Sequence, residues 1–384
     1  MSHSAEKTVR DDLNPLENVG KSRLTQGQKP RWTWIAVLVG ALVVGAAVAA
    51  LLGGGDFNIA GWLILSYILY VIGMYVATRV IENGRKATDG LWRNLVYGAF
   101  ILALLPLVSV IWTVLVQGVP GMLNPGFFAS DMNGVTGAVD LRTAREETNP
   151  LGGIQHAIVG SLLITLTATI ISVPIGLLTS IYLVEYSRGG WLARAITFFV
   201  DVMTGIPSIV AGLFAAGAMA VLVGRGANVM GFTAAIALSV LMIPVVVRST
   251  EEMLRVVPNE LREASYALGV RKWRTILKVV IPTAISGIAS GVTLAIARVI
   301  GETAPILVTA GIALSTNWNL FKDWMMTLPV YIYRQLMNPT APGAPDISSE
   351  RAWGAALVLI IIVMLLNLVA RIIAKAFAPK KTGR

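Results

Sequence analysis

The strongest constraint on this chain is the recurrence of long stretches without a single charged side chain. Eight windows contain no Asp, Glu, Lys or Arg: 32–55, 57–78, 94–129, 148–184, 202–224, 226–247, 279–297 and 352–370. An α-helix needs about 20 apolar residues to cross the roughly 30 Å hydrocarbon core of a bilayer. The windows therefore predict an all-α, polytopic membrane helix bundle with about eight transmembrane helices.

Composition supports this prediction. Of 384 residues, 55% are hydrophobic and only 14% are charged, and the mean hydropathy is +0.71. A water-soluble domain with a single core is much more polar. A membrane barrel would instead show alternating strands of about 10 residues. No secretory signal is evident, because the chain is polar through Arg31 and the first apolar window lacks a cleavage-type end.

The distribution of basic residues predicts the orientation. If the N-terminus is cytoplasmic, only six of the 31 Lys and Arg face outward: Arg142, Arg145, Arg225, Lys322, Arg334 and Arg351. An excess of basic residues on the cytoplasmic side is typical of bacterial inner or plasma membrane proteins. We therefore expect both termini in the cytoplasm, and the net charge of +10 indicates membrane topology and lipid contact rather than a nucleic-acid partner.

The windows and the polar segments divide the chain into four parts. We expect a flexible cytoplasmic tail at 1–31, an additional transmembrane hairpin at 32–82, a transport domain at 91–378 and a basic cytoplasmic tail at 379–384. The outer loop at 317–350 contains a short amphipathic stretch. The four-residue spacing of Gly287 and Gly291 indicates close helix packing. With no Cys and two His, the chain lacks the residues for a zinc or thiolate site, and we expect no cofactor on it.

The cytoplasmic loop 248–282 is predicted to form a helix, a turn and a second helix. Pro258 and Asn259 favour a helix start, Gly269 favours a left-handed stop, and the basic second helix runs to Pro282. Two interpretations are open. The loop docks on a partner protein, or it lies on anionic lipid as an amphipathic helix.

The spacing within this loop favours docking. Glu263, Ala264, Ser265, Gly269 and Pro282 resemble the EAA loop of bacterial ABC importer permeases, with a serine at the second alanine position. The resemblance implies that the loop couples to a cytoplasmic ATPase subunit. No G-x-x-x-x-G-K-[ST] phosphate-binding loop occurs in the sequence. ATP and Mg²⁺ are therefore expected on the partner chain, and this chain is expected not to be an enzyme.

Three further stretches resemble permeases of phosphate ABC importers of the PstA type: 181–214, the GETAP run at 301–305, and LPVYIYRQLMNPTAP at 328–342. The resemblance implies a six-helix permease core within 91–378 that forms half of a phosphate path. It also implies four kinds of partner: a PstC-like permease, two PstB-like ATPase subunits, a PstS-like external binding protein and inorganic phosphate.

Two charged residues, Arg298 and Glu302, follow directly after the seventh window, in what we expect to be the same helix. Arg298 and Glu302 are four residues apart, so we expect them on one helix face and able to pair. Such residues usually line a polar path, and an arginine can donate two hydrogen bonds to phosphate. The predicted substrate path therefore contains Arg298, Glu302, Thr303 as a weak additional donor, and Asp201, which is near enough to the inner interface to be merely interfacial. We hypothesise that the pair opens and closes during transport.

Alternatives to this function are a permease for molybdate or sulfate, the PstC-type partner subunit and a secondary anion transporter. A membrane-embedded enzyme is disfavoured, because no cluster of nucleophile, base or metal ligands is apparent. The role of the hairpin at 32–82 is open.

Overall fold

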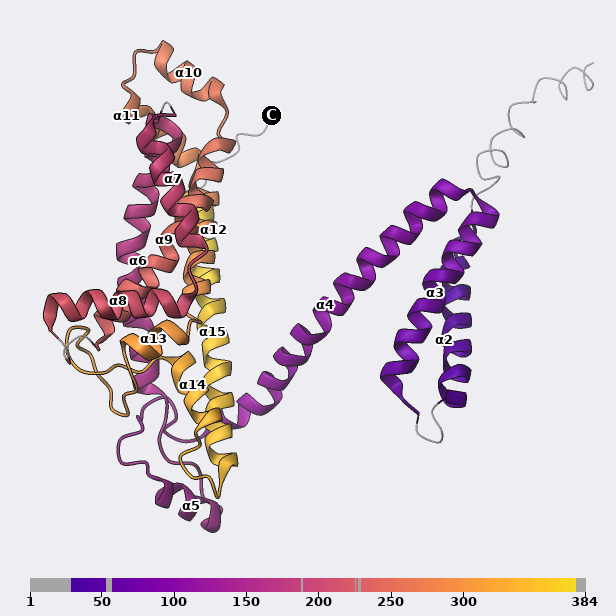
Figure 1. Cartoon of the computed structure of the whole chain (residues 1–384), viewed down its shortest axis with the longest axis horizontal. Coiled ribbons are helices and arrows are strands. Elements are labelled where there is room, and N and C mark those ends of the chain that lie inside the picture. The colour runs from indigo at the N-terminus through magenta and orange to yellow at the C-terminus, as the bar shows by residue number, and fades with distance from the viewer. Residues whose placement is uncertain (1–28, 53–56, 188, 225, 227–228, 378–384) are drawn as a thin grey trace, which may run out of the picture. The chain divides into compact units, whose positions relative to one another are not determined.

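The computed structural model describes residues 29–52, 57–187, 189–224, 226 and 229–377. Most of the predicted N-terminal tail, the basic tail at 379–384 and Arg225 lie outside these residues. The chain divides into two compact units, Met1–Val110 and Ile111–Arg384, and each is described by itself (Figure 1).

The prediction of an all-helical membrane protein is confirmed. Seven helices in the described part of the chain are long and apolar enough to cross a membrane, and an eighth span results if one bent pair is counted. The seven are α2 (Thr33–Leu52), α3 (Ile59–Ile81), α4 (Gly84–Leu123), α6 (Gln155–Ile181) with its π-helical extension η1 (Tyr182–Tyr186), α9 (Gly231–Val256), α12 (Ile281–Val299) and α15 (Pro345–Phe377).

The fifth window is not one straight helix, which corrects the prediction. Helix α7 (Trp191–Thr204) and helix α8 (Ser208–Val223) meet at an angle of 111°. Gly205 ends α7, and Pro207 cannot donate the hydrogen bond that would continue it. Figure 1 shows α8 lying across the direction of the long helices.

The first unit contains the predicted hairpin. Helices α2 and α3 pack against each other, and the indole of Trp62 donates a 3.0 Å hydrogen bond to the carbonyl oxygen of Leu42. Gly45 allows close approach, because a Cβ there would overlap the side chain of Ser66. The phenol of Tyr67 donates to the carbonyl oxygen of Asn94 at 2.7 Å, which holds the first part of α4 to the hairpin.

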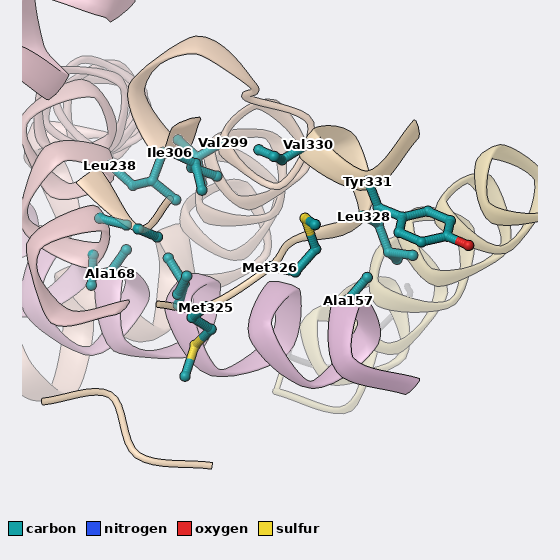
Figure 2. Close-up of a cluster of buried hydrophobic side chains, with 14 of the residues drawn as sticks. Ala157, Ala168, Leu238, Val299, Ile306, Met325, Met326, Leu328, Val330 and Tyr331 are labelled. Carbon is teal, nitrogen blue, oxygen red and sulfur yellow. The ribbon is translucent and has the colours of Figure 1, made fainter. Parts of the chain in front are cut away.

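The second unit is a bundle in which α6 packs along α9, and α12 packs against both α9 and α15. Its core joins these helices to two short outer elements, α13 (Ala304–Thr309) and α14 (Leu328–Met337), the amphipathic stretch that the sequence predicts. Figure 2 shows this core, including Leu238, Ile306 and Tyr331. Helices α10 (Asn259–Ala267) and α11 (Lys272–Thr275) lie at one end of the bundle, and α5 (Gly137–Glu146) lies at the other (Figure 1).

The contact between α6 and the segment before α14 requires a glycine at position 160. A Cβ on Gly160 would overlap the carbonyl oxygen of Met326, which is backbone and cannot rotate away. We expect Gly160→Ala to destabilise the protein by about 1–3 kcal/mol, the usual cost of overpacking. Thermal unfolding in detergent measures this. Gly217→Ala is the matched control, because a Cβ there meets no atom within 4 Å; an equal loss in both variants would contradict the prediction.

Candidate functional site

The loop at 248–282 has the predicted helix–turn–helix form. Helix α10 is followed by Gly269 with φ of 72°, and α11 continues through the π-helical turn η2 (Ile276–Val280) into α12. Only glycine adopts this left-handed conformation at little cost, so Gly269 is the turn. Pro282 is the second residue of α12 and directly follows the π-helical turn η2. Asn259 is the first helical residue of α10 rather than its cap.

The predicted coupling residues divide into two groups. Glu263 and Ala264 are exposed on α10. Ser265 is buried, and its hydroxyl lies 2.8 Å from the hydroxyl of Thr275. Ser265 therefore holds α10 against the second helix, and its side chain does not belong to the exposed face of the loop.

Sequence reasoning missed the residue that anchors this loop. The Nε and Nη2 atoms of Arg262 donate to Oε1 of Glu185 at 3.0 and 2.7 Å. Its Nη1 and Nη2 atoms also donate to the carbonyl oxygens of Val257 (2.6 Å) and Leu254 (2.9 Å). The side chains of Arg262 and Glu185 are 12% and 5% exposed. Burial, together with the Glu185 charge, raises the pKa of neighbouring Tyr266. No local signal reveals this pair, because 77 residues separate its members.

Asp201, in the last turn of α7, belongs to a charge network with the C-terminal part of α9. Its carboxylate pairs with Arg248, Arg248 also contacts Glu251 at 3.1 Å, and Glu251 contacts Arg255 at 2.6 Å. A groove of about 610 Å³ lies beside this network. An arginine already satisfied by two carboxylates favours a structural role, which agrees with the interfacial interpretation of Asp201.

The expected pair of Arg298 and Glu302 is not formed, which corrects the prediction. Helix α12 ends at Val299, and the N–H of Glu302 donates to the carbonyl oxygen of Val299 in the turn that follows. The turn removes Glu302 from the helical face of Arg298, and no ion pair joins them within the described residues. Thr303 precedes the short helix α13 without a capping hydrogen bond from its side chain. Pro305 lies in the first turn of α13 instead of kinking α12.

Arg298 instead terminates an exposed polar face of α12. Exposed residues recur at steps of three or four along this helix: Thr283, Ser286, Ser290, Leu294 and Arg298. Such spacing places them on one side of an α-helix. Within the part of the chain that the structure describes, Arg298 has no hydrogen-bond or ion-pair partner. An unpaired guanidinium and three hydroxyls are costly in lipid, so this face is suited to a polar environment.

A groove of about 590 Å³ follows this face between α9, α12 and α15. Its polar lining includes Ser286, Ser290, Glu252, Asn367 and Arg371. Gly287 and Gly291 form its floor, where a Cβ would overlap Met253 and Ser249 of α9, so the predicted packing role of these glycines is confirmed.

A second feature missed by sequence reasoning is a buried ion pair at the end of the bundle opposite α10 (Figure 1). Arg351 of α15 donates to both carboxylate oxygens of Asp140 of α5, at 2.9 and 2.6 Å, and to the carbonyl oxygen of Leu151 at 2.6 Å. The two charged side chains are 1% and 0% exposed. Nearby, backbone amides of Asn133 and Thr316 donate to Asp131; although burial raises the pKa of this carboxyl, these hydrogen bonds bring it below its ordinary value.

Comparison with known proteins identifies the family. Residues 172–383 match the model described as "Binding-protein-dependent transport system inner membrane component". The chain is 43% identical to "Phosphate transport system permease protein PstA 1" of Mycobacterium tuberculosis (strain H37Rv) over 298 residues, which is 78% of this chain and 91% of that protein. The chain belongs to the PstA family of phosphate transport permeases. The PstA of Pasteurella multocida (strain Pm70) is 36% identical over 78% of this chain and 97% of the relative.

The PstA assignment confirms the family that the loop at 248–282 and the GETAP run indicate. This PstA-family chain is a multi-pass inner-membrane permease subunit of a phosphate ABC transport system, and the ATPase domain is not part of it. Such a system includes an ATPase and a binding protein on other chains. Among solved structures, the inward-facing MetNI methionine ABC transporter covers 57% of this chain and 94% of its own, with 20% identity and a TM-score of 0.45.

Proposed function

We propose that this permease forms half of the phosphate path with the exposed face of α12, and that Arg298 is its anion-binding residue. The observation that carries the proposal is an exposed guanidinium in the last turn of a candidate membrane-spanning helix, with no partner among the described residues. A planar guanidinium donates two parallel hydrogen bonds to phosphate oxygens. The hydroxyls of Ser286 and Ser290 lie along the same face and provide weaker, neutral contacts toward the inner end.

The proposed assembly contains a PstC-like permease that completes the path, two PstB-like ATPase subunits and a PstS-like binding protein. Lipid surrounds the helices, and nucleic acid has no role. The predicted excess of inner basic residues supports cytoplasmic termini. In the second unit, α10 and the last turns of α15 lie at the same end of the bundle, which agrees with that topology (Figure 1). ATP and Mg²⁺ act on the partner ATPases.

Transport by alternating access requires movement to pass from α10 to α12. Helix α11 and η2 continue into α12 without a break, so a displacement of the loop acts directly on the helix that bears Arg298. We assign this structure to the open form of the Arg298–Glu302 pair, in which the guanidinium is available to phosphate. Reformation of the pair after passage would release the anion, because transport needs binding weak enough to reverse.

Uptake by vesicles that contain the complete complex tests the function. Uptake of radiolabelled phosphate should require ATP, and molybdate or sulfate should compete poorly. Efficient competition by either anion would support the alternative oxyanion permease. Uptake that continues without the ATPase subunits would support the secondary transporter.

The docking of α10 gives a further prediction. The chain has no cysteine, so Ala264→Cys introduces a unique thiol on the exposed face of α10. A maleimide–benzophenone reagent at this position should cross-link the permease to the ATPase subunit. Ser265→Cys is the matched control, because this neighbouring side chain is buried against Thr275 and should react little. A cross-link to lipid alone from position 264 would favour the amphipathic-helix interpretation.

A further inference from the structure

The contacts that anchor α10 on the bundle suggest how movement of the loop is transmitted to the bundle. Arg262 contacts two separate parts of the bundle at once: the carboxylate of Glu185 in η1, and the carbonyl oxygens of Leu254 in the last turn of α9 and of Val257 directly after it. We propose that the Arg262–Glu185 pair is the positioning contact that makes α10 move together with the inner ends of α6 and α9. The inference rests on the proposed function, because it assumes that the ATPase displaces α10.

The burial of this pair makes the contact stiff. A charge pair with 12% and 5% exposed side chains is little screened by water, and charge-assisted hydrogen bonds are stronger than neutral ones. Separating the two side chains would leave a buried carboxylate without its cation, which is strongly unfavourable. The pair therefore resists rotation of α10 away from α6.

Three neighbouring contacts connect the same elements. The ammonium of Lys272 lies 5.1 Å from the ring centroid of Tyr186, so the start of α11 also contacts η1. The hydroxyl contact between Ser265 and Thr275 joins α10 to α11. Beneath them, a small apolar core unites α9, η2 and α12 and packs against α6; its buried members are Leu254, Val257, Val280, Ala284 and Ile288.

The pair differs from the other inner ion pairs in what it joins. The Glu251–Arg255 pair lies within one helix, and Arg255 is 64% exposed. Arg262, by contrast, makes five hydrogen bonds. Two go to Glu185 of η1, two go to carbonyl oxygens at the end of α9, and one, at 3.3 Å, goes to Asn259 of its own helix. Without the pair, α10 would act on the bundle through its covalent connections to α9 and α11 and through the contact of Lys272 with Tyr186. With the pair, α10 itself is joined directly to the end of α6.

Glu185→Gln tests the proposal in the complete complex reconstituted into vesicles. Glutamine keeps the shape and one acceptor oxygen but removes the charge. Spin labels are placed on introduced cysteines at Ala267 of α10 and Leu178 of α6, both exposed. With the native Arg262–Glu185 pair, the distribution of distances between the two labels should be narrow and the same with and without ATP. In Glu185→Gln it should broaden, and phosphate transported per ATP hydrolysed should fall by about two- to thirtyfold, the usual range for loss of a coupling contact.

Two further variants complete the test. Arg255→Gln is the control. It breaks the ion pair with Glu251, whose two members both lie on α9, and it should leave the label distances and the transport-to-ATP ratio unchanged. Arg262→Lys keeps the positive charge but cannot reach Glu185 and two carbonyl groups together, so it should show the same loss in weaker form. Arg262→Lys still tests the proposal if the complex with Glu185→Gln does not assemble.

The inference is overturned if Glu185→Gln or Arg262→Lys assembles with a narrow distance distribution and an unchanged transport-to-ATP ratio. The cross-link from Ala264→Cys, measured in the same complexes, separates the two hypotheses. Its absence in the otherwise native complex contradicts the docking of α10 and hence the proposed function. Its presence together with intact coupling in Glu185→Gln contradicts only the role of the pair.

Discussion

Arg298→Ala is expected to reduce phosphate uptake by the reconstituted complex by about 10- to 100-fold, which corresponds to the loss of hydrogen bonds to a charged group worth roughly 1.5–3 kcal/mol. Arg298 is exposed on α12 and has no partner in the parts of the chain that the structure covers. Its removal therefore leaves no buried group unsatisfied, and the unfolding temperature in detergent should not change. Loss of uptake in a fully folded and assembled complex would thus report on the path itself.

Arg298→Lys separates charge from geometry. Lysine keeps the positive charge but lacks the planar fork that matches two phosphate oxygens. We expect uptake between that of the alanine variant and the unmodified permease, with a weakened preference for phosphate over sulfate. Undiminished uptake by Arg298→Lys would show that bidentate recognition at this position is not needed.

Arg351→Ala is expected to destabilise the outer end of the bundle by about 3–5 kcal/mol, because removing one member of a buried ion pair leaves the other without compensation. Asp140 would remain at 0% exposure with neither of its arginine hydrogen bonds. The carbonyl oxygen of Leu151 would also lose a donor. Thermal or chemical unfolding in detergent measures the change.

Two controls distinguish burial from charge loss. Arg142→Ala removes an exposed partner of Glu146, a pair four residues apart on α5, and should cost no more than about 0.5 kcal/mol. The double variant Asp140→Leu, Arg351→Met replaces both charges with apolar groups and should recover much of the stability. A double variant as unstable as Arg351→Ala would place the cost in packing rather than in the unpaired carboxylate.

Local features account for what the sequence predicts correctly. Within the described residues, the eight charge-free windows correspond to seven straight spans and the bent pair, because the cost of placing charges in lipid acts on each segment separately. The loop at 248–282 is equally local: Gly269 has the expected positive φ, and α14 forms where an amphipathic stretch is predicted. Hydropathy cannot show the bend at Pro207, since α7 and α8 are apolar on both sides of it.

The candidate site depends less on local signals. The charge of Arg298 alone makes it a candidate for the substrate path, but its pairing with Glu302 requires that α12 continue beyond Val299. The turn at Ile300 and Gly301 ends the helix and separates the two side chains. The motif resemblance predicts Ser265 as a coupling residue but says nothing of its exposure, and its contact with Thr275 turns the side chain inward.

The sequence by itself determined that this chain is a bundle of membrane helices, where most of them lie, and which family it belongs to, because hydropathy, turn residues and motif spacing act over neighbouring residues. Only the tertiary structure decided which charges meet. Asp140 and Arg351 are 211 residues apart, and Glu185 and Arg262 are 77 apart. Nothing in either local sequence identifies the partner, since each pair forms only when the helices that carry its members pack together and exclude water from both charges.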